Sequence, residues 1–238
     1  MYGARARFGY LSGPIFAESY AYEFYRMAPP GVTLMISTLK YEQGTMEEIE
    51  ACVSLGDRIA QDMARTGASV IIQGVVPINL AFGPKFIDDW IETTQKRCGI
   101  PATTSVTTQM HALQAVGARK VAVLQVGANP VKGLNEYMES FGFEIVGARS
   151  GNFSLVKMST VPPSATMSVA REVVRAFPDA DTIYAPAPHL PFVVNIEELE
   201  QETRKSVVAA GQAIMWEGLR LSGVKDAVPG FGKLLSEH

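Results

Sequence analysis

The sequence predicts an α/β fold of two pseudo-symmetric Rossmann-like halves, each with a four-stranded, mainly parallel sheet flanked by helices, and a ligand cleft between the halves. Two observations lead to this prediction. Apolar runs alternate with amphipathic stretches along the whole chain, as is typical of βα units on a parallel sheet. Three pairs of segments also resemble each other in the same order, which indicates a faint internal repeat. A chain of 238 residues can bury a sizeable core without disulfides or metals.

The repeat gives the expected division of the chain. We expect a first half at residues 1–116 and 211–238 and a second half at residues 117–210. The resembling pairs are ARFGYLSGP (6–14) with RKVAVLQVG (119–127), GASVIIQGVVP (67–77) with DADTIYAPAPH (179–189), and QMHALQAVGARK (109–120) with IMWEGLRLSGVKD (214–226).

Strands are expected where short apolar runs are bounded by turn residues. VTLMIST (32–38) and KVAVLQV (120–126) are examples, rich in the β-branched residues that favour strands. The expected strands span residues 6–12, 32–38, 69–73, 101–104, 120–126, 143–148, 181–185 and 206–210.

Helices are expected in the amphipathic stretches between these strands. In the clearest of them, Thr45 and Glu48 have the spacing of a capping box, and apolar residues including Ile49 and Cys52 then recur on one helical stripe. Cys52 is therefore expected as a small buried residue. The expected helices span residues 17–28, 45–65, 84–97, 106–116, 130–140, 164–176, 194–204 and 211–222.

Composition and charge exclude several classes of protein. A formal charge of −3 leaves no basic surface for phosphate backbones, so no nucleic-acid partner is expected. No apolar run approaches the roughly 18 to 20 residues that cross a bilayer, and the first residues lack the apolar region of a signal peptide. We therefore expect no membrane partner and a cytoplasmic location. An apolar fraction of 47% makes a homo-oligomer plausible without fixing its size.

Ligands of parallel sheets bind beyond the carboxyl ends of the strands, which here are the ends of the first, third, fifth and seventh expected strands. Glycines at several of these ends leave backbone N–H groups accessible to a carboxylate, with no side chain in the way. The expected substrate-binding residues are Ser12, Gly13, Pro14, Gln73, Gly74, Val75, Val76, Asn79, Gly127, Asn129, Ala187 and Pro188.

His189 is the first candidate for a catalytic residue. It follows Pro186 and Pro188 and precedes Pro191, so prolines stiffen the loop that carries it. A positioned imidazole can act as an acid or a base near neutral pH. The alternative is a loop histidine that is hydrogen-bonded to backbone.

Glu18 is the second candidate, because it lies just beyond Pro14 in SGPIFAESY (12–20). Its carboxylate could serve as a general base or bind a polar substrate group. The alternative is a structural role, since an acidic residue near a helix start is stabilised by the helix dipole.

No metal and no cofactor are expected. The three histidines are far apart, and neither an HxH nor an HxxxH group is present. Neither GxGxxG nor GxxxxGK[ST] occurs, which disfavours a nucleotide cofactor.

The chain resembles the aspartate/glutamate racemase superfamily, and within it the arylmalonate decarboxylase and maleate isomerase branch. The resemblance is carried by GIPATTSVTTQMHALQAVGARKVAVL (99–124), MWEGLRLSGVKDAVPGFGKLL (215–235) and YEFYRMAPPGVTL (22–34). It implies two α/β halves with a site between them and cofactor-free chemistry next to a carboxylate. It also implies catalytic cysteines, which act as acid and base in the racemases, as proton donor in the decarboxylase and as nucleophile in maleate isomerase.

This sequence departs from that pattern. The first-half cysteine position falls within Gly74, Val75 and Val76, and the second-half position falls at about Ala187. Val75 and Val76 also replace hydroxyl residues of the decarboxylase, and Gly127 replaces its pocket tyrosine. The chain therefore resembles a family whose thiol mechanism it cannot run.

Two main hypotheses about function follow. The first is a cofactor-independent, decarboxylase-like lyase or isomerase that acts on a small carboxylate or carbonyl compound through an enolate-type intermediate, without a cysteine nucleophile. The second is a catalytically inactive protein that binds small carboxylates. A maleate-isomerase-like cis-trans isomerase is a further alternative. Each of them takes a small-molecule carboxylate as its partner.

Overall fold

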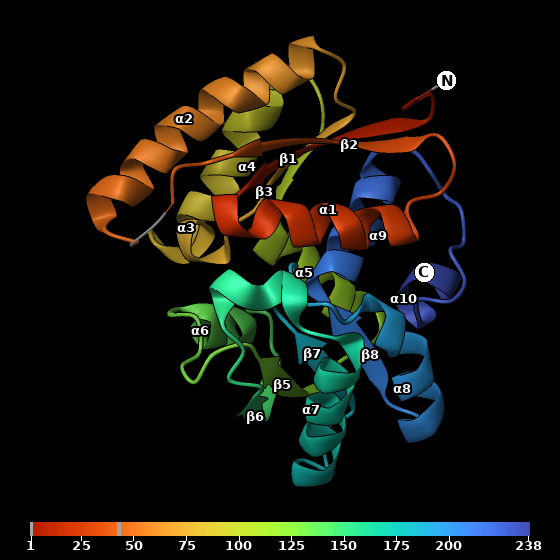
Figure 1. Ribbon diagram of the computed structural model, residues 1–238. Helices are drawn as coiled ribbons and strands as arrows, with labels where there is room; N and C mark the ends of the chain where they lie inside the picture. Colours follow the sequence, from red (N-terminus) through yellow and green to blue (C-terminus); the bar gives the residue numbers. More distant parts are fainter. Residues whose placement is uncertain (1, 42–43) are drawn as a thin grey trace.

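The computed structural model describes residues 2–41 and 44–238 and contains two four-stranded sheets (Figure 1). The strand orders are β2-β1-β3-β4 and β6-β5-β7-β8, and every pairing is parallel. The two sheets have the same order when their strands are renumbered, so the pseudo-symmetry expected from the repeat is present. The predicted α/β architecture is confirmed.

Each strand lies within two residues of its expected position. The strands are β1 (Ala6–Ser12), β2 (Val32–Thr38), β3 (Val70–Gln73), β4 (Ala102–Thr104), β5 (Lys120–Gln125), β6 (Glu144–Ser150), β7 (Thr182–Ala185) and β8 (Ser206–Ala209).

The expected helices are also present, although α6 begins four residues later than expected. Gly133 adopts a positive φ of 81° immediately before it, so the chain turns there and the helix starts afterwards. The helices α3 and α10 and three short 3-10 helices were not expected. The helices are α1 (Ala17–Met27), α2 (Met46–Arg65), α3 (Val76–Leu80), α4 (Pro84–Cys98), α5 (Ser105–Ala115), α6 (Leu134–Ser140), α7 (Pro163–Ala176), α8 (Ile196–Thr203), α9 (Ala210–Leu221) and α10 (Lys233–Glu237), and the 3-10 helices are η1 (Pro14–Phe16), η2 (Leu155–Thr160) and η3 (Val193–Asn195).

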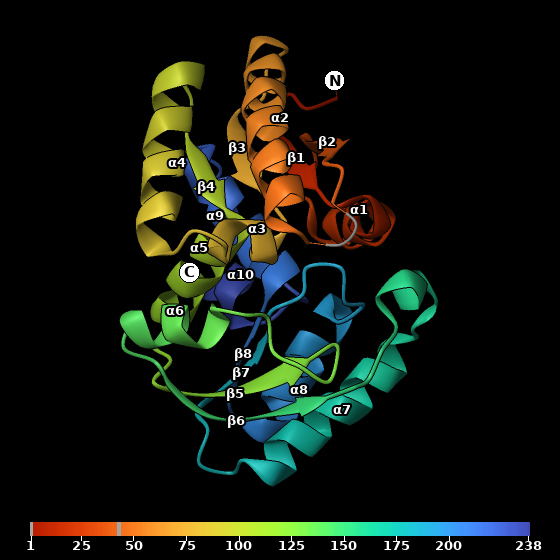
Figure 2. The ribbon, with the colours of Figure 1, turned by 90° about the vertical axis from the view of Figure 1, so that its left-hand side faces the viewer.

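Two helices lie between the sheets. Figures 1 and 2 both place α5 and α9 there, and α9 contacts β3 of the first sheet and β8 of the second. Gly218 allows the close packing of α9, because a Cβ atom at that position would lie 2.2 Å from Cε2 of Phe8. On the outer side of the first sheet, α2 packs against α4 and against β1 and β3.

The apolar core is continuous between the two sheets. One cluster of buried side chains includes Phe8 and Ile72 of the first sheet together with Leu124 and Ile183 of the second. The short helix α10 contacts α9 and β8, so the last residues pack against a strand of the second sheet. The expected boundaries at residues 116 and 210 remain a prediction.

Among the described residues, no helix is long and apolar enough to cross a membrane.

Candidate functional site

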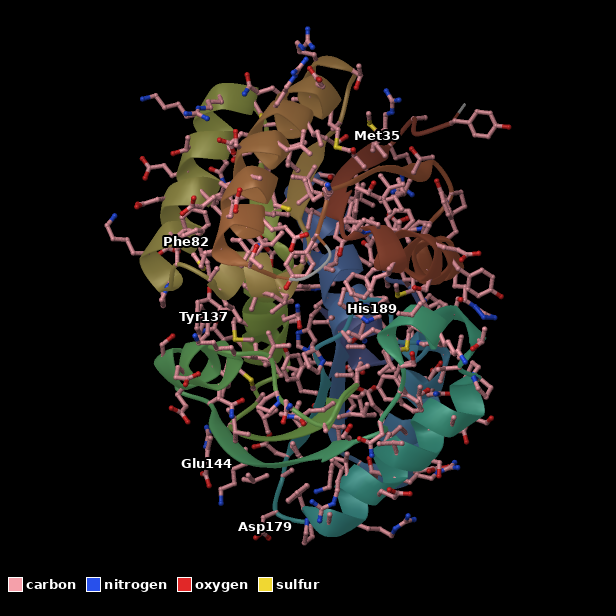
Figure 3. The ribbon with its side chains drawn as sticks, turned by 60° about the vertical axis from the view of Figure 1, so that its left-hand side comes forward. Met35, Phe82, Tyr137, Glu144, Asp179 and His189 are labelled. Carbon is pink, nitrogen blue, oxygen red and sulfur yellow. The ribbon has the colours of Figure 1, made fainter. Side chains whose placement is uncertain are left out.

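A cavity of about 270 Å³ lies at the carboxyl ends of the central strands of both sheets. Its wall is built from the segments that follow β1, β3, β5 and β7, so both halves contribute to it. Figure 3 shows His189 near the middle of the molecule, between the two sheets. The expected residues that line the cavity are Ser12, Gly13, Val75, Val76, Gly127, Asn129, Ala187, Pro188 and His189.

The remaining candidates lie outside the lining. Pro14 and Glu18 are exposed, and Glu18 stands in the first turn of α1. Gln73, Gly74 and Asn79 are buried beside the cavity without contributing to its wall. The structure thus brings His189 to the cavity and leaves Glu18 in solvent.

His189 is a buried side chain with unused hydrogen-bonding capacity. It is 6% exposed, and neither ring nitrogen has a hydrogen-bond partner among the described residues. Its ring stacks on Phe16 with centroids 4.0 Å apart and an angle of 22° between the planes. Burial lowers the pKa of the imidazole from 6.5 to about 4, so the ring is neutral at pH 7.

The backbone of the loop that holds His189 has little conformational freedom. It follows β7, and its only internal backbone hydrogen bond runs from the N–H of Leu190 to the carbonyl of Ala187. Pro186 and Pro188 fix the φ angles on either side of Ala187. The imidazole is therefore held in place by the loop and by the ring of Phe16.

Tyr10 and Phe16 belong to the cavity wall and were not among the predicted site residues. The hydroxyl oxygen of Tyr10 would be only 2.6 Å from a Cβ atom at Gly74. Burial raises the pKa of this hydroxyl, which therefore stays protonated. Strand alternation could have indicated Tyr10, because it precedes Ser12 by two residues on β1 and so shares its face of the sheet.

The backbone at Val75 has an unusual conformation. Its φ and ψ angles of 59° and 75° lie in the left-handed region, where a β-branched residue is strained. This turn leads from β3 into α3 and leaves the N–H groups of Val75 and Val76 without an acceptor among the described residues. Both residues line the cavity, so two backbone donors are available at its wall.

The sequence matches the family described as arylmalonate decarboxylase over residues 26–235. The chain belongs to the arylmalonate decarboxylase family. It is 26% identical to the arylmalonate decarboxylase of Bordetella bronchiseptica over 214 residues, which cover 87% of this chain and 88% of that relative. The resemblance inferred from the sequence is confirmed.

Solved structures of the arylmalonate decarboxylase family and of maleate isomerases share this fold. A liganded variant of arylmalonate decarboxylase superposes with a TM-score of 0.84 at 22% identity, covering 98% of this chain and 100% of that one. The maleate isomerase of Pseudomonas putida S16 gives a TM-score of 0.82 at 22% identity, with 98% of each chain covered. A Nocardia farcinica maleate cis-trans isomerase variant with a covalently bound succinylcysteine intermediate gives 0.84 at 19% identity, over 98% of this chain and 99% of that one. The relative found by sequence is therefore an enzyme, a decarboxylase, and the isomerases share the fold.

The two cysteines of this family member lie away from the cavity. Cys52 is buried on α2, as expected, and its Sγ donates a hydrogen bond to the carbonyl of Lys40 at 3.2 Å. Cys98 is the last residue of α4. Burial raises the pKa of both thiols, and neither residue belongs to the cavity wall. Among the described residues, no group of three or more histidine, cysteine or acidic side chains is arranged to hold a metal ion.

Proposed function

We propose that this protein is a cofactor-independent lyase or isomerase that acts on a small carboxylate or carbonyl compound through an enolate-type intermediate, without a cysteine nucleophile. The observation that carries the proposal is His189, a buried imidazole in the cavity wall with both nitrogens unpartnered. Burying such a group without hydrogen bonds costs stability, so its position is best explained by a ligand that supplies the missing partner.

The protonation state of His189 suits it to proton transfer once a ligand binds. Burial alone keeps its pKa at about 4 and the ring neutral. A substrate carboxylate placed beside the ring favours the imidazolium form and raises that pKa. His189 then carries a proton that it can deliver to carbon.

For the lyase, the steps balance as follows. The bond between the substrate carbon and its carboxylate breaks, carbon dioxide leaves, and the electron pair passes into a neighbouring carbonyl to form an enolate. His189 donates its proton to the carbon, and solvent returns one proton to the ring. One proton is consumed for each carbon dioxide released. In an isomerase, His189 would instead take the proton from carbon and return it.

Backbone donors support the binding of the charge that develops on the enolate. Val75 and Val76 line the wall at the turn after β3, and their N–H groups have no acceptor among the described residues. Fixed donors of this kind stabilise a developing oxyanion and cost no reorganisation during the reaction. The Tyr10 hydroxyl, which burial keeps protonated, is a third donor in the same wall.

The proposal is tested by replacing His189. We expect His189→Asn to lower turnover by roughly 10² to 10⁴, because a positioned acid or base contributes that factor. Release of carbon dioxide and isomer interconversion are measured over a panel of aryl and alkyl carboxylates, including malonates and maleate. The matched control is His111→Asn, since His111 lies on α5 outside the cavity. Unchanged turnover in the His189 variant would remove this residue from the mechanism.

A second candidate is a binding protein without turnover. Val75 and Ala187 favour it, because apolar side chains occupy the positions where the family resemblance expects cysteines. A ligand that raises the melting temperature, combined with no turnover across the whole panel, would support this alternative over the enzyme.

A further inference from the structure

The wall of the cavity has no fixed charge. None of its residues is aspartate, glutamate, lysine or arginine within the part of the chain that the structure describes, and the only groups that titrate are His189 and two tyrosines. A carboxylate bound here can gain at most one positive partner, the imidazolium of His189. A second carboxylate would lie in the same small volume with no cation to neutralise it.

Part of the wall cannot donate hydrogen bonds from its backbone. Four prolines contribute to it, Pro77, Pro130, Pro186 and Pro188. Proline has no N–H group, so these positions offer only ring carbons and a carbonyl oxygen. The side-chain donors that remain include Ser12, Gln125, Asn129 and Asn135, and all of them are neutral. A dicarboxylate can therefore gain hydrogen bonds here but no second cation.

The apolar part of the wall comes mainly from the second sheet. Val123 and Val126 project from β5 and its end, and Val131 and Leu134 lie where the chain enters α6. The rings of Phe16 and His189, which stack on each other, also belong to the wall. Such a space favours a planar hydrocarbon group, and its volume of about 270 Å³ admits one ring with a short side chain.

We infer that the cavity takes a planar apolar compound with one carboxylate or none, and that it discriminates against dicarboxylates. The single polar end of the ligand meets His189, the Tyr10 hydroxyl and the backbone donors of Val75 and Val76. The inference rests on the proposed function for the location of the ligand, but it does not require turnover. With a single carboxylate, the lyase reaction demands that a neutral carbonyl on the same substrate receives the electron pair, as in an apolar 3-oxo acid.

The test compares three probes with the same ring, namely phenylacetate, phenylmalonate and phenylacetamide. Their dissociation constants are measured by calorimetry on the full-length protein at pH 7.5, where phenylmalonate is a dianion. We expect phenylacetate to bind at least about tenfold more tightly than phenylmalonate, and phenylacetamide to bind within about tenfold of phenylacetate. Equal or tighter binding of phenylmalonate overturns the inference, and so does the failure of both other probes to bind below about 10 mM.

A pair of charge-adding variants isolates the cause. Val131→Lys places an ammonium in the cavity wall, and Gln114→Lys adds the same charge on the exposed side of α5. Val131→Lys should reduce the preference for phenylacetate over phenylmalonate by at least about threefold, and Gln114→Lys should leave it unchanged. Equal effects of the two variants would show that net charge, and not the cavity wall, sets the preference, which contradicts the inference.

Failure of this inference is separable from failure of the proposed function. Carbon dioxide release from phenylmalonate, abolished by His189→Asn, would overturn the inference and leave the proposed function standing. Selective binding of phenylacetate without turnover of any carboxylate or 3-oxo acid would support the inference and contradict the proposed function.

Discussion

His189 is neutral in the folded protein and protonates readily once the chain unfolds. Its pKa is about 4 when buried, against an ordinary value of 6.5. Between these values the unfolded chain binds a proton that the folded protein does not. The contribution of His189 to the free energy of unfolding is therefore highest above pH 6.5 and falls as the pH falls toward 4. Over the whole window the loss is on the order of 3 kcal/mol.

His189→Gln should flatten this dependence on pH. Urea unfolding at pH 7 and pH 5 gives the free energy of unfolding of the protein and of the variant. We expect the variant to lose about 2 kcal/mol less between these two pH values. Buried acids such as Glu23 and Glu200 titrate in both proteins, so their contributions cancel in the difference. An identical pH dependence would show that the imidazole is not buried in its neutral form.

At the level of single residues, the sequence predicts the position of His189 at the cavity, but it does not predict the position of Glu18. Three prolines around His189 indicate a rigid loop. An acidic residue near a helix start, in contrast, does not predict the direction in which its side chain points. The helical period settles this, since Tyr20, Glu23 and Phe24 share the buried face of α1 and Glu18 lies on the other side. Glu23 accordingly accepts the N–H of Val193 at 3.2 Å, while Glu18 remains in solvent.

The helix α9 packs closely against β1, and Gly218 is the position that permits it. A methyl group there would overlap the ring of Phe8, which is completely buried. Gly218→Ala should therefore lower the free energy of unfolding by roughly 1 to 3 kcal/mol. This cost outweighs the gain of up to about 1 kcal/mol that alanine brings to a helix interior.

Gly56, inside α2, is the matched control. A Cβ atom at Gly56 would lie 3.4 Å from a methyl group of Leu11, an ordinary contact. Gly56→Ala should keep or raise stability by up to about 1 kcal/mol. Urea denaturation of both variants checks the pair, and equal effects would contradict the close approach of α9 to β1.

Element boundaries followed from the sequence wherever an element was long and periodic. The helix α3 was missed because it has five residues, too few to show a period, and because Val75, Val76 and Pro77 read as the end of a strand. A left-handed valine cannot be recognised from composition, since asparagine and glycine are the usual residues there. The two N–H groups that we assign to ligand binding could therefore be identified only from the structure.

At the scale of the whole molecule, the cavity joins the ends of strands from both sheets. A bound ligand should therefore protect both halves together. We expect saturating phenylacetate to slow hydrogen exchange in peptides that cover residues 74–76 and 187–190, while peptides from residues 47–58 of α2 keep their rates. Mass spectrometry of exchanged peptides measures this. Protection confined to one half would place the ligand elsewhere.

The chain passes between the two sheets at two places, and both lie close to the central helices. It leaves the first sheet between α5 and β5, and it leaves the second where β8 continues directly into α9, which packs against β1 and β3. One cluster of buried apolar side chains also draws on both sheets. Any widening of the cavity that separates the strand ends of the two sheets therefore exposes apolar surface to water and costs free energy.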